Sequence, residues 1–347
     1  MGTDATARDG SFGVLAMGHV LGEPVEVAPV AREYTDDVTK IETWGYRTFH
    51  RAEAGTGLTD LAESAGQLAL KRSGVDAADV DLLVLAMSDI AEHLYWDPAA
   101  ATQARLGAHQ AEALLLNQAC VSGVLSFDAV AGKFATHPEY RTALVIAANR
   151  VCEQYWNRME STTSISSDGA AAAVLVRDHP RCRWLATATI SDGRYANFFR
   201  LSLGGAAHPF RPGEHRPALV DNPFDRLEDF FGRDHRAMLR FVETIGERNR
   251  EVLARACAQA CVAPESVTRV IHQNDNLRAF AELAEELAIP LERTNVALAM
   301  QLGHLGCADH LLCLESHLAA GDLAAGDIVA LTSVGSGMHW ACTLLRI

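Results

Sequence analysis

One cysteine stands at a position where a thiol can act as a nucleophile. Cys120 lies in "LLLNQACVSGVLSFDAVAG", residues 114–132, where an apolar strand pattern changes to a helical pattern without a turn signal. A thiol with a pKa of about 8.5 is mostly protonated at neutral pH. Unpaired N–H groups at a helix N-terminus favour the thiolate, and a neighbouring imidazole can accept the proton. The placement therefore predicts a nucleophile, although a lone cysteine at a helix start is more often a small buried apolar residue.

Two histidines occupy positions from which they could reach such a thiol. His272 ends the strand pattern "RVIH", and loops at strand ends normally build functional sites. His304 follows Gly303 just before a second helical pattern. Either imidazole could accept the proton of Cys120, although a histidine at a strand end is commonly a hydrogen-bonded structural residue.

A glycine-rich turn supplies candidate donors for an oxyanion. The segment "SVGSGMHW", residues 333–340, follows a strand pattern and contains Gly335 and Gly337. Exposed N–H groups of this turn could join the N–H of Cys120 and hold the negative charge that develops on a carbonyl oxygen under attack. Thiol, imidazoles and donors together predict acyl transfer through a thioester intermediate.

An internal repeat predicts how these residues meet. Two helix–strand units near the N-terminus have counterparts near the C-terminus at nearly the same offset. The paired segments are 75–86 with 262–273, and 120–150 with 304–337. The repeat indicates two similar α/β halves, with helices layered on mostly buried sheets. A pseudo-twofold axis between the halves would make Cys120 face the turn at His304.

The repeat divides the chain into three predicted parts. Residues 1–191 form the N-terminal half, which carries the nucleophile, and residues 237–347 form the C-terminal half, which carries both histidines. Between them, residues 192–236 contain Pro, Gly, Arg and clustered Phe with little periodicity. A segment of this length is either a functional cover or a surface excursion, and both interpretations stay open.

Composition argues against several other classes of protein. The chain has 347 residues, of which 49% are hydrophobic and 21% charged, and its formal net charge of −14 disfavours binding to nucleic acid or to a membrane surface. The N-terminus lacks the pattern of a secretory signal, and the densest apolar stretch is far short of the roughly 20 residues of a membrane span. The eight cysteines form no CxxC pair, so we expect reduced thiols in a cytoplasmic protein. No residues have the spacing of a metal site.

At these residues the chain resembles the thiolase-fold condensing enzymes of the β-ketoacyl-acyl-carrier-protein synthase III group. The resemblance spans nearly the whole chain, through five motifs in the family's order: "LNQACVSGV", "SSDGAAAAVLV", "VIHQNDNLRAF", "LGHLGCADHLL" and "SVGSGMHWACTLLRI". It implies an α/β thiolase fold with five layers, αβαβα, and a homodimer. It also implies an acyl group delivered by acyl-CoA or acyl carrier protein, so that CoA or phosphopantetheine thioesters are substrates and no cofactor is needed.

The resemblance implies residue roles, with two departures from the family. In condensing members a cysteine is acylated, and a His and an Asn then assist decarboxylation of a malonyl thioester. Cys120 and His272 match the first two positions, whereas His304 stands where the family has Asn. The loop "HQNDNLR" is one residue longer than the family's "HQANLR".

These departures leave more than one function open. Family-like proteins without the Asn resemble enzymes of specialised, polyketide-type metabolism that move the acyl group to a hydroxyl, an amine or a carrier-protein thiol. In that interpretation His272 is the general base and His304 orients the acceptor or assists at the carbonyl. The alternative is a decarboxylative condensing enzyme, because elongating ketosynthases also use a Cys-His-His set. A non-catalytic heterodimer subunit is disfavoured, because the chain keeps Cys120 and both imidazoles.

The resemblance also suggests substrate contacts. Trp44 and Arg47 lie in "IETWGYRTFHR", which is similar to the family's segment for the CoA nucleotide. His93, Leu94 and Trp96 lie where the family gates its substrate, so we expect them to shape the acyl pocket of this chain or of a dimer partner. Phe198, in the segment between the halves, is expected to line the same pocket.

Overall fold

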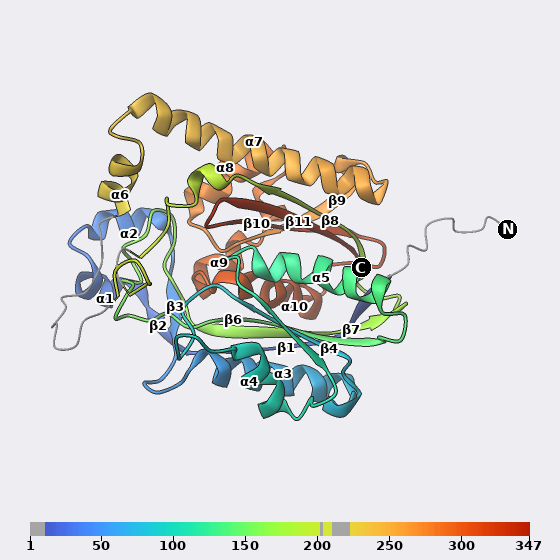
Figure 1. Ribbon diagram of the computed structural model, residues 1–347. Coiled ribbons are helices and arrows are strands. Elements are labelled where there is room, and N and C mark those ends of the chain that lie inside the picture. Colours follow the sequence, from blue (N-terminus) through green and yellow to red (C-terminus); the bar gives the residue numbers. More distant parts are fainter. Residues whose placement is uncertain (1–10, 202–203, 210–222) are drawn as a thin grey trace.

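The fold consists of five layers in the order helix, sheet, helix, sheet, helix (Figure 1). The computed structural model describes residues 11–201, 204–209 and 223–347, so the predicted cover segment 192–236 lies partly outside the described residues. Outer helices cover the far face of each sheet, and further helices lie between the sheets (Figure 1). This is the arrangement that the family resemblance implies.

The N-terminal sheet has five strands, and both of its faces are covered by helices. In spatial order the strands are β1 (Phe12–Leu21), β7 (Gly169–Arg177), β6 (Thr142–Asn149), β4 (Leu82–Met87) and β5 (Glu112–Leu116). Its outer helices are α3 (Leu58–Ser73) and α4 (Pro98–Leu106), and its inner helix is α5 (Ser122–Thr136). All six residues of β4 are buried, as expected for a parallel strand covered on both faces.

The C-terminal sheet repeats this plan with four strands. In spatial order they are β8 (Arg183–Ser191), β11 (His339–Arg346), β10 (Ile328–Gly335) and β9 (Val267–His272). Its outer helix is α7 (His235–Ala260), and its inner helix is α10 (Asp309–Ala320). Smaller elements complete the described fold: β2 (Glu23–Glu26), α1 (Val27–Tyr34), α2 (Val38–Trp44), β3 (Thr48–Arg51), α6 (Pro223–Phe230), α8 (Leu277–Glu286) and α9 (Val296–Leu302).

The strand orders bear out the internal repeat. The order β1-β7-β6-β4 in one sheet corresponds to β8-β11-β10-β9 in the other, and β5 is an additional edge strand. The predicted boundary after residue 191 needs a correction. β8 lies within 1–191 but pairs antiparallel with β11, so it is the first strand of the C-terminal sheet. The short connection from β7 to β8 looks like a hairpin in sequence, whereas the two strands belong to different sheets.

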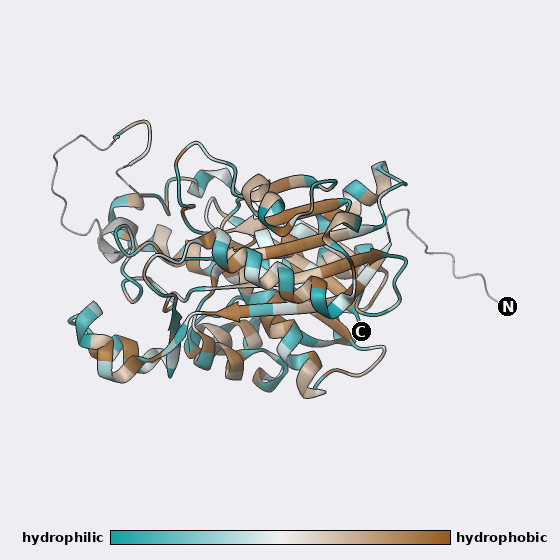
Figure 2. Ribbon diagram, turned by 90° about the horizontal axis from the view of Figure 1, so that it is seen from below, coloured by the Kyte–Doolittle hydropathy of each residue, from teal (hydrophilic) through white to brown (hydrophobic). Residues whose placement is uncertain are grey.

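The central helices bury their apolar faces between the sheets. Val124, Phe127 and Val130 of α5 are fully buried in a core that includes residues of both sheets. Figure 2 shows the interior strands as largely hydrophobic, while the helices carry hydrophilic residues outward. At the N-terminus of α5 the backbones of the two halves pack closely. A Cβ on Gly123 would lie only 2.1 Å from the carbonyl oxygen of Cys307.

Replacing Gly123 should therefore disturb the contact between the halves. We expect Gly123→Ala to lower the free energy of unfolding by about 2 to 3 kcal/mol, because the backbone of Cys307 must move. Gly132→Ala in the same helix is the matched control, since no atom lies within 4 Å of its Cβ position. It should raise stability by up to about 1 kcal/mol. Urea denaturation measures both changes, and equal stabilities for the two variants would contradict the close approach.

Candidate active site

A tight turn presents Cys120 between β5 and α5. Ala119, the residue before it, has φ of +52°, a left-handed conformation that costs a non-glycine residue roughly 1 kcal/mol or more. Hydrogen bonds hold the turn: the N–H of Ser122 donates to the carbonyl of Ala119 at 3.0 Å, and the N–H of Gln118 donates to the hydroxyl of Ser122 at 2.7 Å. The thiol is thus fixed two residues before the first residue of α5, close to the predicted helix N-terminus.

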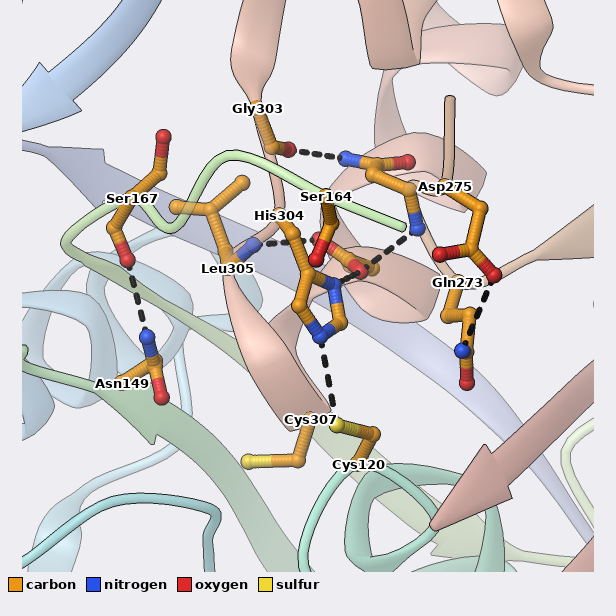
Figure 3. Close-up of polar contacts among 12 residues, drawn as sticks. Cys120, Asn149, Ser164, Ser167, Gln273, Asp275, Gly303, His304, Leu305 and Cys307 are labelled. Atoms are coloured by element: carbon orange, nitrogen blue, oxygen red, sulfur yellow. Dashed lines mark hydrogen bonds and ion pairs between the residues drawn. The ribbon is translucent and has the colours of Figure 1, made fainter. Parts of the chain in front are cut away.

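His304 meets the thiol from the other half. Its Nε2 lies 3.2 Å from the Sγ of Cys120 (Figure 3). The main chain of His304 is clamped on both sides: its N–H donates to the carbonyl of Ile165 at 2.8 Å, and its carbonyl accepts from the N–H of Ser167 at 2.8 Å. Gly303 precedes it with φ of +66°, a conformation that glycine adopts readily. The imidazole therefore approaches the sulfur from a rigid turn.

Asp309, which sequence reasoning missed, orients this imidazole. Its Oδ2 lies 2.6 Å from His304 Nδ1. The carboxylate is fully buried at the first position of α10, and it also accepts hydrogen bonds from the N–H groups of Leu305 and Asn274, each at 2.7 Å. The only sequence signal was an acidic residue at a helix start, which is equally typical of a structural cap.

The charges around His304 favour its protonated form. Burial disfavours the imidazolium, but the Asp309 carboxylate and the Cys120 sulfur beside the ring outweigh burial and raise the pKa of His304 well above its usual value. The His304 ring can thus accept the proton of the thiol, so that Cys120 and His304 form a thiolate–imidazolium pair. The three side chains form a nucleophile, a base and an orienting carboxylate.

His272 has different partners. Its Nδ1 lies 2.9 Å from the hydroxyl of Thr332, and its Nε2 lies 3.8 Å from Asp275 Oδ2. Asn295 holds its main chain by accepting from the N–H and donating to the carbonyl, both at 2.8 Å. Burial, followed by the neighbouring His310 and His304, lowers the pKa of His272 to about 3, so the ring is neutral near pH 7. His304, and not His272, lies at hydrogen-bond distance from the thiol.

The predicted oxyanion turn packs against the nucleophile turn. Gly335 ends β10, and a Cβ there would lie 2.9 Å from the carbonyl oxygen of Gln118. Gly337 has φ of +120° and lies against the ring of His339. Gly335 therefore permits a close approach to the Cys120 loop, and the role of both glycines as donors stays a prediction.

The predicted CoA contacts differ in exposure. Trp44 is buried in a core cluster, and the ammonium of Lys40 lies 4.9 Å from the centre of its ring. Arg47 is exposed, and its N–H donates to the carbonyl of Met300 at 2.7 Å, next to the turn that carries His304. Arg47 can thus contact a ligand outside the site, whereas Trp44 supports the segment from inside.

The predicted pocket residues are spread over two regions. His93 and Trp96 pack edge to face at 5.1 Å, and the neighbouring Leu94 is 78% exposed, so Leu94 lines no enclosed pocket within this chain. Phe198 is buried in an aromatic cluster against α6 and α7, and its partners include Phe230 and Phe241. These residues follow loops whose course depends on tertiary packing, which the sequence pattern does not reveal.

The described part of the chain contains neither a metal-ion cluster nor a membrane-spanning helix. Within residues 11–201, 204–209 and 223–347, no three His, Cys, Asp or Glu side chains gather in a way that could hold a metal ion. Over the same ranges, none of the helices has the length and apolarity needed to span a membrane. All eight cysteines are free thiols, and Cys120 is among the few that are not buried.

Known proteins resemble this chain in sequence and in fold. Profiles described as 3-Oxoacyl-[acyl-carrier-protein (ACP)] synthase III and its C terminal match residues 116–193 and 257–347. β-Ketoacyl-[acyl-carrier-protein] synthase III of Thermosynechococcus vestitus is 30% identical over 303 residues, 87% of each chain. The protein of the same name from Syntrophomonas wolfei is 27% identical over 336 residues, 96% of each chain. The solved structure of ChlB3, described as an acyltransferase, is 24% identical with a TM-score of 0.84, covering 97% of this chain and 98% of that one. The predicted thiolase fold is thereby confirmed.

Removing the Asp309 charge should weaken the thiolate–imidazolium pair. In Asp309→Asn the pKa of His304 falls, the ring loses its proton at lower pH, and the thiolate loses its counter-charge. We expect alkylation of Cys120 by iodoacetamide at pH 7 to slow by about tenfold to a hundredfold, measured by peptide mass mapping. Asp322→Asn is the control, because Asp322 contacts His317 Nδ1 at 2.9 Å beyond the far end of α10. Equal rates in Asp309→Asn and the parent protein would refute the coupling.

The low pKa of His272 predicts a loss of stability in acid. The folded-state pKa of about 3 lies below the unfolded value of about 6.5, so the unfolded chain binds more protons between these values. The free energy of unfolding should therefore fall as pH falls through this window. His272→Asn removes the contribution, and the variant should lose about 1 to 2 kcal/mol less than the parent between pH 6.5 and pH 5. Urea denaturation at several pH values in this range measures the free energy of unfolding. His109→Asn, at an exposed position, is the control. The same dependence of stability on pH in the parent and in His272→Asn would contradict the prediction.

Proposed function

Because the chain belongs to the β-ketoacyl-[acyl-carrier-protein] synthase III family, we propose that it is an acyltransferase that carries an acyl group on Cys120 and passes it to a second acceptor. The acceptor is a hydroxyl, an amine or a carrier-protein thiol. The observation that carries the proposal is the chain of contacts from Cys120 Sγ to His304 at 3.2 Å and from His304 to Asp309 at 2.6 Å. The setting is specialised, polyketide-type metabolism.

In the loading step, the Cys120 thiolate attacks the carbonyl carbon of an acyl-CoA or acyl-carrier-protein thioester. A new C–S bond forms, and the carbonyl electrons move to oxygen, where the N–H of Cys120 and the Gly335–Gly337 turn would hold them. When this intermediate collapses, the C–S bond to the donor breaks. The His304 imidazolium gives its proton to the departing thiolate, so that acyl-Cys120 and a neutral imidazole remain.

In the transfer step, His304 acts as the general base. Its Nε2 takes the proton from the acceptor O–H, N–H or S–H as that atom attacks the acyl carbonyl. The C–S bond to Cys120 then breaks, and the thiolate returns beside the newly protonated ring. Asp309 keeps the proton of Nδ1 in place and stabilises the imidazolium, in the way that an aspartate supports the histidine of a hydrolase triad.

The difference between the two imidazoles favours transfer over decarboxylative condensation. In condensation the nucleophile is generated by loss of CO2, so no proton has to be removed from it, and both imidazoles would polarise the malonyl carbonyl. Here the carboxylate of Asp309 makes His304 basic, whereas His272 stays neutral with a pKa of about 3. A basic imidazole next to the nucleophile is suited to deprotonating a heteroatom acceptor. The neutral His272 would support the site by hydrogen bonding.

The donor and the assembly state belong to the same proposal. The exposed Arg47 would contact the phosphates of a CoA donor near the turn that carries His304. A second copy of the chain would cover β5, because β5 is an edge strand of the described sheet and its five residues are only half-buried. In such a homodimer, the exposed Leu94 and Tyr95 would be covered by the partner.

Intact-mass measurement tests the function. Incubation with a panel of acyl-CoA donors should add one acyl mass, and Cys120→Ala should abolish it. Cys152→Ala is the matched control, because Cys152 is another partly exposed thiol and should leave the adduct unchanged. A chain that never gains an adduct from any donor would be a non-catalytic subunit. Stoichiometric CO2 release and a β-keto product after addition of malonyl carrier protein would instead establish the condensing reaction.

A further inference from the structure

We infer that the carboxyl of Asp275 borders the position of the acyl acceptor and selects a neutral or cationic acceptor over an anionic, malonyl-type thioester. The inference rests on the proposed function and specifies the acceptor class for the same site. It arises from the loop after His272, which places Asp275 beside that imidazole.

Asp275 reaches the same space as the two imidazoles. Its Oδ2 lies 3.8 Å from His272 Nε2, and the charge of His304 acts on its carboxyl. Its side chain is 11% exposed, which is similar to the 13% of His304 and the 6% of His272, whereas the side chain of Asp309 is completely enclosed. Asp309 is therefore a carboxylate sealed behind the imidazole, and Asp275 is a carboxyl that a bound molecule can still touch.

A hydrogen-bonded chain fixes where the Asp275 carboxyl lies. The side-chain amide of Gln273 donates from Nε2 to Asp275 Oδ2 at 3.1 Å (Figure 3). The other end of that amide is anchored on β10, since its Oε1 accepts from the N–H of Val334 at 2.8 Å and from the hydroxyl of Ser333 at 3.0 Å. Because an N–H of Val334 can only donate, the amide nitrogen must face Asp275. The carboxyl is thus held in place before any substrate binds.

The charges around Asp275 make it selective. On balance the pKa of Asp275 is raised, because burial outweighs the opposing charge of His304, and the nearby Asp309 adds to the rise. A malonyl carboxylate placed in this poorly hydrated space would lose its hydration beside two acidic groups, and whichever of them is ionised would repel it strongly where water is excluded. A hydroxyl or amine can instead donate a hydrogen bond to an oxygen of Asp275, whichever protonation state the carboxyl has.

Asp275 takes no proton in this scheme. The acceptor proton still passes to His304 Nε2 as the acceptor oxygen or nitrogen attacks acyl-Cys120, the C–S bond breaks, and the sulfur leaves as the thiolate. Asp275 binds and orients the acceptor before that step, so it is a positioning and specificity residue. Its loss should change the choice of acceptor and leave the loading of Cys120 intact.

The test uses the full-length enzyme acetylated on Cys120 by acetyl-CoA. Hydroxylamine then removes the acetyl group, and a thioester bound at the acceptor position slows that removal. The probes are malonyl-pantetheine and its methyl ester, which differ mainly in one negative charge. We expect the parent enzyme to be half-protected by the neutral ester at a concentration at least about tenfold lower than by the free acid.

Variants assign that discrimination to Asp275. In Asp275→Asn the concentration of malonyl-pantetheine that gives half-protection should fall about tenfold, towards that of the ester, while acetylation by acetyl-CoA stays within about twofold of the parent. Asp275→Glu keeps the charge and should still exclude the free acid. Asp79→Asn, at an exposed position on the outer surface, is the neutral control and should behave like the parent.

The possible results separate the two proposals. If the parent enzyme never gains an acetyl group, the proposed function fails. If it is acetylated but is protected equally by acid and ester, or if Asp275→Asn discriminates as the parent does, only the inference about Asp275 fails. Should Asp275→Asn not fold, the comparison of acid and ester on the parent enzyme decides alone.

Discussion

The site depends on one buried carboxylate and the hydrogen bonds that hold it. Asp309 accepts from the N–H groups of Leu305 and Asn274 and from the ring of His304. A carboxylate removed from water is costly unless its lone pairs find donors, and here three donors supply that compensation, two from the turn at His304 and Leu305 and one from the loop at Asn274. The same bonds that make its burial tolerable therefore fix the imidazole and connect the loop after His272 to the turn before α10.

The neighbouring asparagines extend this order through the C-terminal half. Asn295 donates to the side-chain oxygen of Asn274 at 2.8 Å, and Asn274 in turn donates to the carbonyl of Gly303 at 2.8 Å. Both asparagines are almost completely buried. Through them the strand end at His272 and the turn at His304 form one hydrogen-bonded unit. This unit fixes the position of the neutral imidazole of His272 relative to the basic imidazole of His304. Catalytic geometry in this protein is thus a property of a network more than of single side chains.

The sequence predicted the architecture better than the roles. Helix and strand periodicity were strong enough to reveal the repeat, and the repeat correctly placed Cys120 opposite His304. The role of Asp309 could not be predicted, because an acidic residue at the first position of a helix is common and says nothing about which imidazole it contacts. β8 was assigned to the wrong sheet, since pairing with β11 is a long-range choice that local pattern does not encode. That Leu94 shapes a pocket of this chain or of a dimer partner stays a prediction, because its 78% exposure depends on a loop path that only the packed structure defines.

The turn from His304 to Asp309 has a further consequence for how the enzyme becomes competent. The base and its supporting carboxylate are five positions apart in one half, while the sulfur comes from the other. The pairing of thiol and imidazole therefore needs residues of both halves. A relative displacement of the halves would change the sulfur-to-nitrogen distance and strain the main-chain hydrogen bonds that tie His304 to Ile165 and Ser167, while the contact between His304 and Asp309 would stay intact.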